Sequence, residues 1–447
     1  MSIADKMIRS ALCQYIYSPQ QQEKFQNKEL HRLVRYAREH SPYLRELYRD
    51  VGEEFQLTDL PITNKQMMME HYDVWTTDPE IKLRELQEFV KDPANIGRRY
   101  KGKYLVASTS GSTGYPLHYP MNSEMINVST CTALLSKALK KRPVALVFPG
   151  NLFLIATGAI HANMRRYPHI MKKNYRFVDA MLPPEEIAAQ LNEIQPRTIY
   201  GYSTLVESIA EQAERGNLHI SVEEAICCSE MLTDHARQYI QAQLGCTTRS
   251  IYGCTETGNI GIDGLCGHMH LNNPYVIVEL VDEHNQPVPP GQQAYKALVT
   301  SLCSDTLPII RYELMDRLVL HTEGCTCGDH SPWVELEGRS GLQLLEFRGG
   351  RKVTPMLLYV AVEVMDTLRK FQIILHDDDV LEFRAIFMPG VDEAAVFREA
   401  RQRILDYLAT CGVERASVYL SKEEPAIDPV SHKFKSVFQV HDRAPQE

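Results

Sequence analysis

The strongest constraint on the fold is an alternation of short apolar runs with amphipathic segments between residues 104 and 256. Two of the segments between the runs, PPEEIAAQLNEI and TLVESIAEQAERGN, have the spacing of helices that bury one face. This alternation predicts parallel strands, because a parallel connection needs a crossover long enough to hold a helix. Each run ends in small or polar residues, which is typical of strand ends that present ligand loops. The runs are YLVAS, PVALVF, RTIYGY, EEAICCSE and TRSIYGCTE.

The segments on either side of this region have other patterns. Roughly the first hundred residues have helical spacing, and irregular strands are expected at Ala294–Thr300 and Leu307–Tyr312. After residue 342 the strands KFQIILH and LEFRAIF and the helix AAVFREARQRILDYLA predict a compact α+β unit. We therefore expect an α/β fold with two domains. Residues 1–340 form a large N-terminal domain of stacked α/β sheets plus a β region, and residues 341–447 form a small α+β C-terminal domain.

Charge and apolar patterning exclude several classes of protein. The formal net charge of −9 argues against nucleic-acid binding, which needs a basic surface. The N-terminus has no uninterrupted apolar stretch, so we expect no signal peptide. The apolar run Val144–Ala162 contains Pro149, Gly150, Asn151 and Gly158, which favours core structure over a membrane span. Eleven cysteines without a secretory signal predict reduced thiols in a cytoplasmic protein. The sequence leaves open whether the protein forms a homodimer.

Five short stretches carry residues suited to chemistry. STSGSTG, at 108–114, is a loop of small residues able to surround phosphate, but Tyr115 stands where a Walker loop has lysine. IYGCTETG places Glu256 directly after an apolar run, and LPIIRYELMDR contains Asp316. EGRS, at 337–340, and SHKFKSV, at 431–437, complete the series. Each stretch alone is weak, because Ser/Gly turns, loop glutamates and lysines are common on surfaces.

Taken in order, these five stretches resemble the adenylate-forming superfamily of acyl- and aryl-CoA ligases. The closest likeness is to its phenylacetate–CoA ligase branch, including the capsule-biosynthesis-type relatives, and it runs from about residue 100 to about residue 440. The resemblance implies that ATP and Mg²⁺ activate a carboxylic acid to an acyl-adenylate, with release of pyrophosphate. The acyl group would pass to the thiol of coenzyme A or of a carrier protein, and the branch prefers aromatic acids.

The resemblance also implies roles for individual residues. Glu256 would hold Mg²⁺, Thr255 would lie against the α-phosphate, and Lys433, on a mobile small domain, would stabilise the transition state, with Lys435 as the alternative. The acid pocket would involve Phe148, His161 and Tyr202. The remaining nucleotide-binding residues would be Ser110, Gly111, Ser112, Thr113 and Gly114 at the phosphates, Ser229, Glu230, Tyr252 and Gly253 at the adenine, and Asp316 and Arg339 at the ribose.

Three departures from the family pattern leave alternatives open. Ser340-Gly341-Leu342 replaces the acidic pair at the hinge between the domains, so the thioester half-reaction is less certain than adenylation. Leu314-Met315 and His432 replace small residues next to Asp316 and Lys433. The alternatives are an enzyme that stops at the adenylate or acylates an amine or a carrier, and a non-catalytic nucleotide-binding relative.

Two clusters of soft ligands predict a metal site. LCGHMH contains Cys266, His268 and His270, and GCTCGDH contains Cys325 and Cys327. Thiols and imidazoles in two short clusters favour a tetrahedral structural zinc site. Relatives in the resembling branch often carry a similar cluster. We choose Cys266, His270, Cys325 and Cys327 as ligands, with His268 as the replacement; the other interpretation is two unrelated loops with buried thiols.

Overall fold

The computed structural model divides the chain into two compact units, residues 1–337 and 338–447, whereas the sequence placed the boundary between residues 340 and 341. Each unit is described by itself. The structure describes residues 3–92, 95, 98–108, 117–125, 128, 143–148, 175–180, 182–228, 232–264, 266–339, 345–353, 355–363, 365, 367–410, 412–426 and 435–440.

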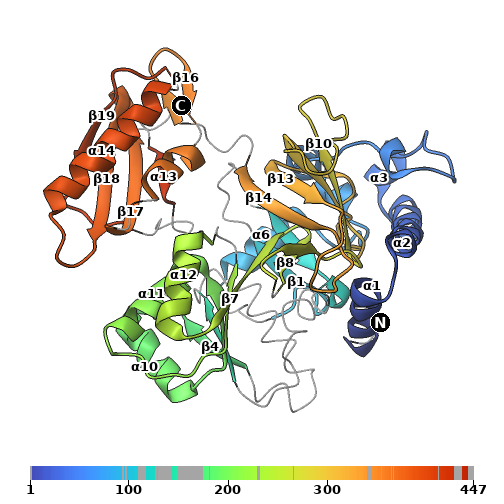
Figure 1. Cartoon of the computed structure of the whole chain (residues 1–447). Coiled ribbons are helices and arrows are strands. Elements are labelled where there is room, and N and C mark those ends of the chain that lie inside the picture. Colours follow the sequence, from blue (N-terminus) through green and yellow to red (C-terminus); the bar gives the residue numbers. More distant parts are fainter. Residues whose placement is uncertain are drawn as a thin grey trace. The chain divides into compact units, whose positions relative to one another are not determined.

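A nine-stranded sheet forms the centre of the large unit (Figure 1). Its strands β4, β3, β5, β6 and β7 are parallel, so four of the five predicted apolar runs are confirmed as parallel strands. The order of the strands is β13 (Asp316–His321), β14 (Trp333–Arg339), β9 (Met269–Leu271), β8 (Gly258–Asp263), β7 (Thr247–Cys254), β6 (Glu224–Cys228), β5 (Thr198–Tyr202), β3 (Val144–Phe148) and β4 (Tyr175–Asp179).

Within the described ranges, helices α10 (Pro184–Ile194), α11 (Ser203–Glu214) and α12 (Asp234–Leu244) lie against the parallel part of this sheet (Figure 1). Leu191, Val206 and Ile240 project from them into a core that includes Ala145 and Ile199 of the strands. Helices α10 and α11 coincide with the two predicted amphipathic segments, whereas α12 was not predicted. The class of fold expected from the sequence is confirmed.

The fifth apolar run, YLVAS, is not a strand of the parallel sheet. It forms β1 (Leu105–Ser108), which pairs antiparallel with β2 (His118–Met121) in a sheet of two strands. The chain between Ser108 and His118 is shorter than the dozen or so residues that a parallel crossover needs. A direct antiparallel return is therefore the available connection.

The β region of the large unit is a three-stranded antiparallel sheet of β10 (Val276–Val281), β11 (Lys296–Ser301) and β12 (Tyr312–Leu314). The prediction at Ala294–Thr300 corresponds to β11, but the strand predicted at Leu307–Tyr312 is wrong, because β12 begins only at Tyr312. The reason is Arg311, whose φ of 46° is left-handed and turns the backbone out of a strand. Its guanidinium is bonded to Glu279 at 3.0 Å and to the carbonyls of Thr58 and Leu60, which holds this conformation.

The N-terminal part is helical, as predicted, and packs on the β region. The Trp75 indole is fully buried and donates to the carbonyl of Pro308 at 2.9 Å. Among helices in the described ranges, none has the length and apolar character that crossing a membrane requires. The elements are α1 (Ile3–Tyr15), α2 (Pro19–His40), α3 (Pro42–Leu47), η1 (Leu57–Asp59), α4 (Lys65–Glu70), α5 (Tyr72–Trp75) and α6 (Leu83–Lys91).

The small unit is an α+β structure around a four-stranded sheet in the order β19-β18-β17-β20. β17 (Leu368–His376) and β18 (Val380–Phe387) are antiparallel, whereas β19 (Ser417–Leu420) and β20 (Val437–Gln439) run parallel to their neighbours. Helices α13 (Pro355–Glu363) and α14 (Glu393–Thr410) cover one face with a common apolar core. The short elements are β15 (Leu345–Phe347), β16 (Arg351–Val353) and η3 (Asp377–Asp379).

Candidate functional site

Glu256 lies in the tight turn between β7 and β8 and is 7% exposed. It therefore differs from most loop glutamates, which are exposed to solvent. The Tyr312 hydroxyl donates to its Oε1 at 3.3 Å. Gly253 permits this turn, because a Cβ there would lie 2.3 Å from the carbonyl oxygen of Gly258. Burial and then the Glu256 carboxylate raise the pKa of Tyr312 above its ordinary value. The phenol therefore stays protonated and remains a donor to Glu256.

Asp316 is the first residue of β13 and is 2% exposed. The hydroxyl of Tyr252, on β7, donates to its Oδ2 at 2.7 Å. The two buried carboxylates thus each accept a hydrogen bond from a tyrosine, which reduces the cost of keeping a charge away from water. Carboxylates can hold a hard cation or accept hydrogen bonds from ligand hydroxyls, as the resemblance assigns to Glu256 and Asp316.

Sequence reasoning missed Tyr312 and Arg311 as parts of this site. The segment around Arg311 is bonded to the N-terminal region. The backbone N–H of Thr63 donates to the Arg311 carbonyl at 3.0 Å, and the Thr63 carbonyl accepts from the backbone N–H of Glu313 at 2.8 Å. The signal was the dipeptide Arg311-Tyr312, which lies inside the quoted stretch LPIIRYELMDR. Its importance depends on contacts with residues far away in the sequence, which no local pattern contains.

The other predicted residues are placed to different degrees. Tyr202 is 7% exposed and ends β5, Thr255 is half-buried beside Glu256, and Lys435 places its Nζ 5.9 Å from the centre of the Phe438 ring. Phe148 and Arg339 end β3 and β14, and the structure describes their backbones. The predicted residues outside the described ones are Ser110, Gly111, Ser112, Thr113, Gly114, His161, Ser229, Glu230 and Lys433.

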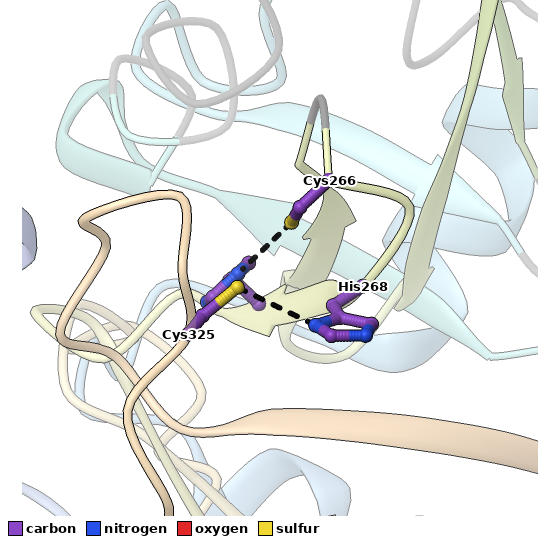
Figure 2. A group of neighbouring side chains, drawn as sticks. Cys266, His268 and Cys325 are labelled. Carbon is purple, nitrogen blue, oxygen red and sulfur yellow. Dashed lines mark hydrogen bonds between the residues drawn. The ribbon is translucent and has the colours of Figure 1, made fainter.

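The two Cys/His clusters come together in the large unit (Figure 2). Cys266 and Cys327 each place Sγ 3.5 Å from Nε2 of His270, and Cys325 places Sγ 3.4 Å from Nδ1 of His268. Ligand atoms of Cys266, His268, His270 and Cys325 all lie within 4.8 Å of one another. Bonds of 2.0–2.3 Å to a tetrahedral zinc put neighbouring ligand atoms about 3.6 Å apart. These spacings fit a zinc ion.

The surroundings orient these ligands. Nδ1 of His270 contacts the carbonyl oxygen of Ser331 at 3.1 Å, which leaves Nε2 toward the thiols. The His268 ring stacks on Trp333 at 3.9 Å. Gly264 is needed for the close approach, because a Cβ there would lie 2.8 Å from Sγ of Cys266. A hydrogen bond from the backbone N–H of Cys327 lowers the pKa of the Cys325 thiol, which favours the thiolate that metal binding requires.

Comparisons with known proteins agree with the fold and with the motifs. No family model matches the chain. The phenylacetate–coenzyme A ligase of Thermus thermophilus is 23% identical over 405 residues, which cover 85% of this chain and 83% of that protein. Protein CapK of Staphylococcus aureus is 23% identical over 269 residues, 54% of this chain and 55% of that protein.

Two solved structures share the fold. The 2-hydroxyisobutyryl-CoA ligase in the postadenylation state, in complex with 2-HIB-AMP, has a TM-score of 0.72 at 18% identity and covers 97% of this chain and 92% of its own. A benzoate–CoA ligase of Burkholderia xenovorans LB400 has a TM-score of 0.53 at 16% identity, with 74% and 67% covered. Five motifs in the order of the adenylate-forming superfamily, a sequence relative that spans most of both chains and a shared fold make this chain phenylacetate–CoA ligase-like.

Proposed function

We propose that the protein is an AMP-forming ligase that activates a carboxylic acid with ATP and passes the acyl group to the thiol of coenzyme A. The observation that carries this proposal is the pair of buried carboxylates, Glu256 after β7 and Asp316 at the start of β13, each of which accepts a hydrogen bond from a tyrosine hydroxyl. They occupy the two positions that the family motifs assign to the metal and the ribose. The fold shared with a ligase in complex with 2-HIB-AMP supports the same function.

In the first half-reaction a carboxylate oxygen of the acid attacks the α-phosphorus of ATP. A new O–P bond forms, the bond to the β-phosphate oxygen breaks, and pyrophosphate leaves. Asp316 would accept hydrogen bonds from the ribose hydroxyls, and the Tyr252 hydroxyl, bonded to Oδ2, would fix the orientation of that carboxylate. Lys433 would add a positive charge to the transition state, where charge on the phosphorus oxygens must be neutralised.

Mg²⁺ would be held by Glu256. Its buried carboxylate is the oxygen ligand that this hard cation prefers, and the ion would neutralise charge on the phosphates. The Tyr312 hydroxyl donates a hydrogen bond to Oε1 of Glu256 and would keep this carboxylate in one rotamer.

The second half-reaction would transfer the acyl group from the adenylate to sulfur, with AMP as the leaving group. Coenzyme A is the acceptor we propose, because a relative of the same fold was solved with 2-HIB-AMP and CoA in the thioesterfication state. We propose an aromatic acid as the substrate. This choice is supported by the names of the phenylacetate and benzoate ligases and by Tyr202, buried at the carboxyl end of β5.

We further propose that the Cys/His cluster holds one structural zinc ion. Cys266, His270 and Cys325, with Cys327 or His268 as the fourth ligand, supply the nitrogen and sulfur donors that zinc prefers. Four protein ligands leave no position for substrate. The ion would cross-link the loop after β8 to the loop before β14 and so stabilise the end of the sheet that follows Glu256.

The experiment that tests the ligase is an ATP–pyrophosphate exchange screen over aromatic and aliphatic acids, repeated with coenzyme A. Acid-dependent exchange together with thioester formation is the expected result. Exchange without thioester would identify an enzyme that stops at the adenylate or uses another acceptor. Tight ATP binding without exchange by any acid would contradict the proposal and favour a non-catalytic nucleotide-binding protein.

A further inference from the structure

Gln372 is a buried amide on the side of the small unit's sheet that faces away from the helices. Its neighbours Phe371 and Ile373 belong to the core formed with α13 and α14, and side chains alternate along a strand, so Gln372 points to the other face. It is 2% exposed. A buried polar side chain of this kind must find partners for its N–H groups, and those partners show what it does.

The partners of Gln372 lie on two separate stretches of the chain. Its Nε2 donates to the carbonyl oxygen of Ala426 at 3.0 Å and to that of Lys435 at 2.9 Å. Its Oε1 accepts from the backbone N–H of Ala426 at 3.2 Å. A side-chain amide has two N–H donors, and here each is used on a different stretch. One side chain therefore bonds to the residue before and to the residue after 427–434.

Other contacts fasten the same two stretches to β17 and β18. On the first, the backbone N–H of Ser421 donates to Phe383 at 2.8 Å, and Glu423 pairs with Arg384 at 2.6 Å. On the second, the backbone N–H of Ile373 donates to Ser436 at 2.8 Å, after which β20 runs parallel to β17. Gln372 lies between them and holds the two ends together.

We infer that Gln372 is a positioning residue for Lys433, which the sequence places between the two stretches that Gln372 joins. The inference rests on the proposed function, in which Lys433 contacts the reacting phosphate. Fixing both ends of a short segment removes many of its conformations before the substrate binds. A charge that acts only in the transition state depends on such placement, since a displacement of about 1 Å can cost about a hundredfold in rate.

The test replaces Gln372 by methionine, which keeps the length of the side chain and removes both N–H donors. The matched control is Ile404→Val, a fully buried position on α14 that weakens the core on the other face of the same sheet. We expect Gln372→Met to lower the maximal ATP–pyrophosphate exchange rate about ten- to a hundredfold, while the KM for ATP changes less than about twofold. Ile404→Val should keep the wild-type rate.

A double mutant separates positioning from a general loss of structure. If Gln372 acts through Lys433, then Gln372→Met should cause no further loss in a protein that already carries Lys433→Ala. An equal fractional loss in both backgrounds would overturn the inference. Should Gln372→Met unfold, Gln372→Glu serves instead, because its carboxylate has the size of the amide but no N–H donor, and the same comparison applies.

The two proposals fail in different ways. A wild-type exchange rate in Lys433→Ala would contradict the role of the lysine and hence the proposed mechanism. A slow Lys433→Ala protein combined with a wild-type rate in Gln372→Met would overturn the inference about Gln372 alone.

Discussion

Replacing Tyr252 by phenylalanine should selectively weaken recognition of the ribose. The substitution removes the hydroxyl that donates to Oδ2 of Asp316 at 2.7 Å and keeps the ring that the family motif places along the adenine. Asp316 is buried, so water cannot replace the lost donor without rearrangement. A hydrogen bond to a charged group contributes about 1.5–3 kcal/mol. Because Asp316 keeps other interactions, we take the lower part of that range. This corresponds to a loss of about ten- to thirtyfold in kcat/KM for ATP.

The assay is ATP–pyrophosphate exchange with ATP and with its 2′- and 3′-deoxy analogues. The analogues lack a hydroxyl that Asp316 would bind, so the preference for ATP over them should shrink in Tyr252→Phe. Tyr312→Phe is the matched control, because it removes the hydroxyl that donates to Glu256 and not the one at Asp316. It should change the dependence on Mg²⁺ and leave the ribose preference as it is. An unchanged KM for ATP together with an unchanged preference in Tyr252→Phe would refute the reasoning.

Three further predictions concern the metal sites and the small unit. Glu256→Gln should abolish pyrophosphate exchange but leave the melting temperature near that of the wild type, because Glu256 lies in a turn; activity at limiting Mg²⁺ would show that the motif is misplaced. The wild type should contain about one zinc ion per chain, and Cys325→Ser should lose it and melt at a lower temperature, as elemental analysis and calorimetry would measure. Wild-type protein that contains no metal after purification without chelator would show that these cysteines are ordinary thiols and not metal ligands. Although burial alone would raise it, hydrogen bonds from Arg384, Ser421 and His376 lower the pKa of Glu382 from 4.5 to about 2. A lowered pKa adds stability that is present above pH 4.5 and is lost as the pH falls toward 2, so acid unfolding of Glu382→Gln should vary less with pH over that window than that of the wild type.

Local patterns in the sequence were sufficient for the strands and helices whose formation depends mainly on their own residues. The runs that became β3, β5, β6 and β7 are apolar on both faces and are separated by room for crossover helices, so only a covered parallel sheet suits them. The glutamate of IYGCTETG was placed correctly in a turn after β7, because the turn follows from neighbouring glycines. The residues of the Cys/His cluster could be named from the sequence because two short motifs contain all of them.

Tertiary structure decided which distant residues meet. The sequence could not show that Tyr312 donates a hydrogen bond to Glu256 or that Tyr252 donates one to Asp316, because these partners are 56 and 64 positions apart. It also missed the left-handed Arg311, which is held by Glu279 and by carbonyls of the N-terminal helical region, and it did not single out Gln372. Propensity and periodicity act over a few residues, whereas these contacts form only after the chain has closed long loops around a common core, so their signals are absent from any single stretch.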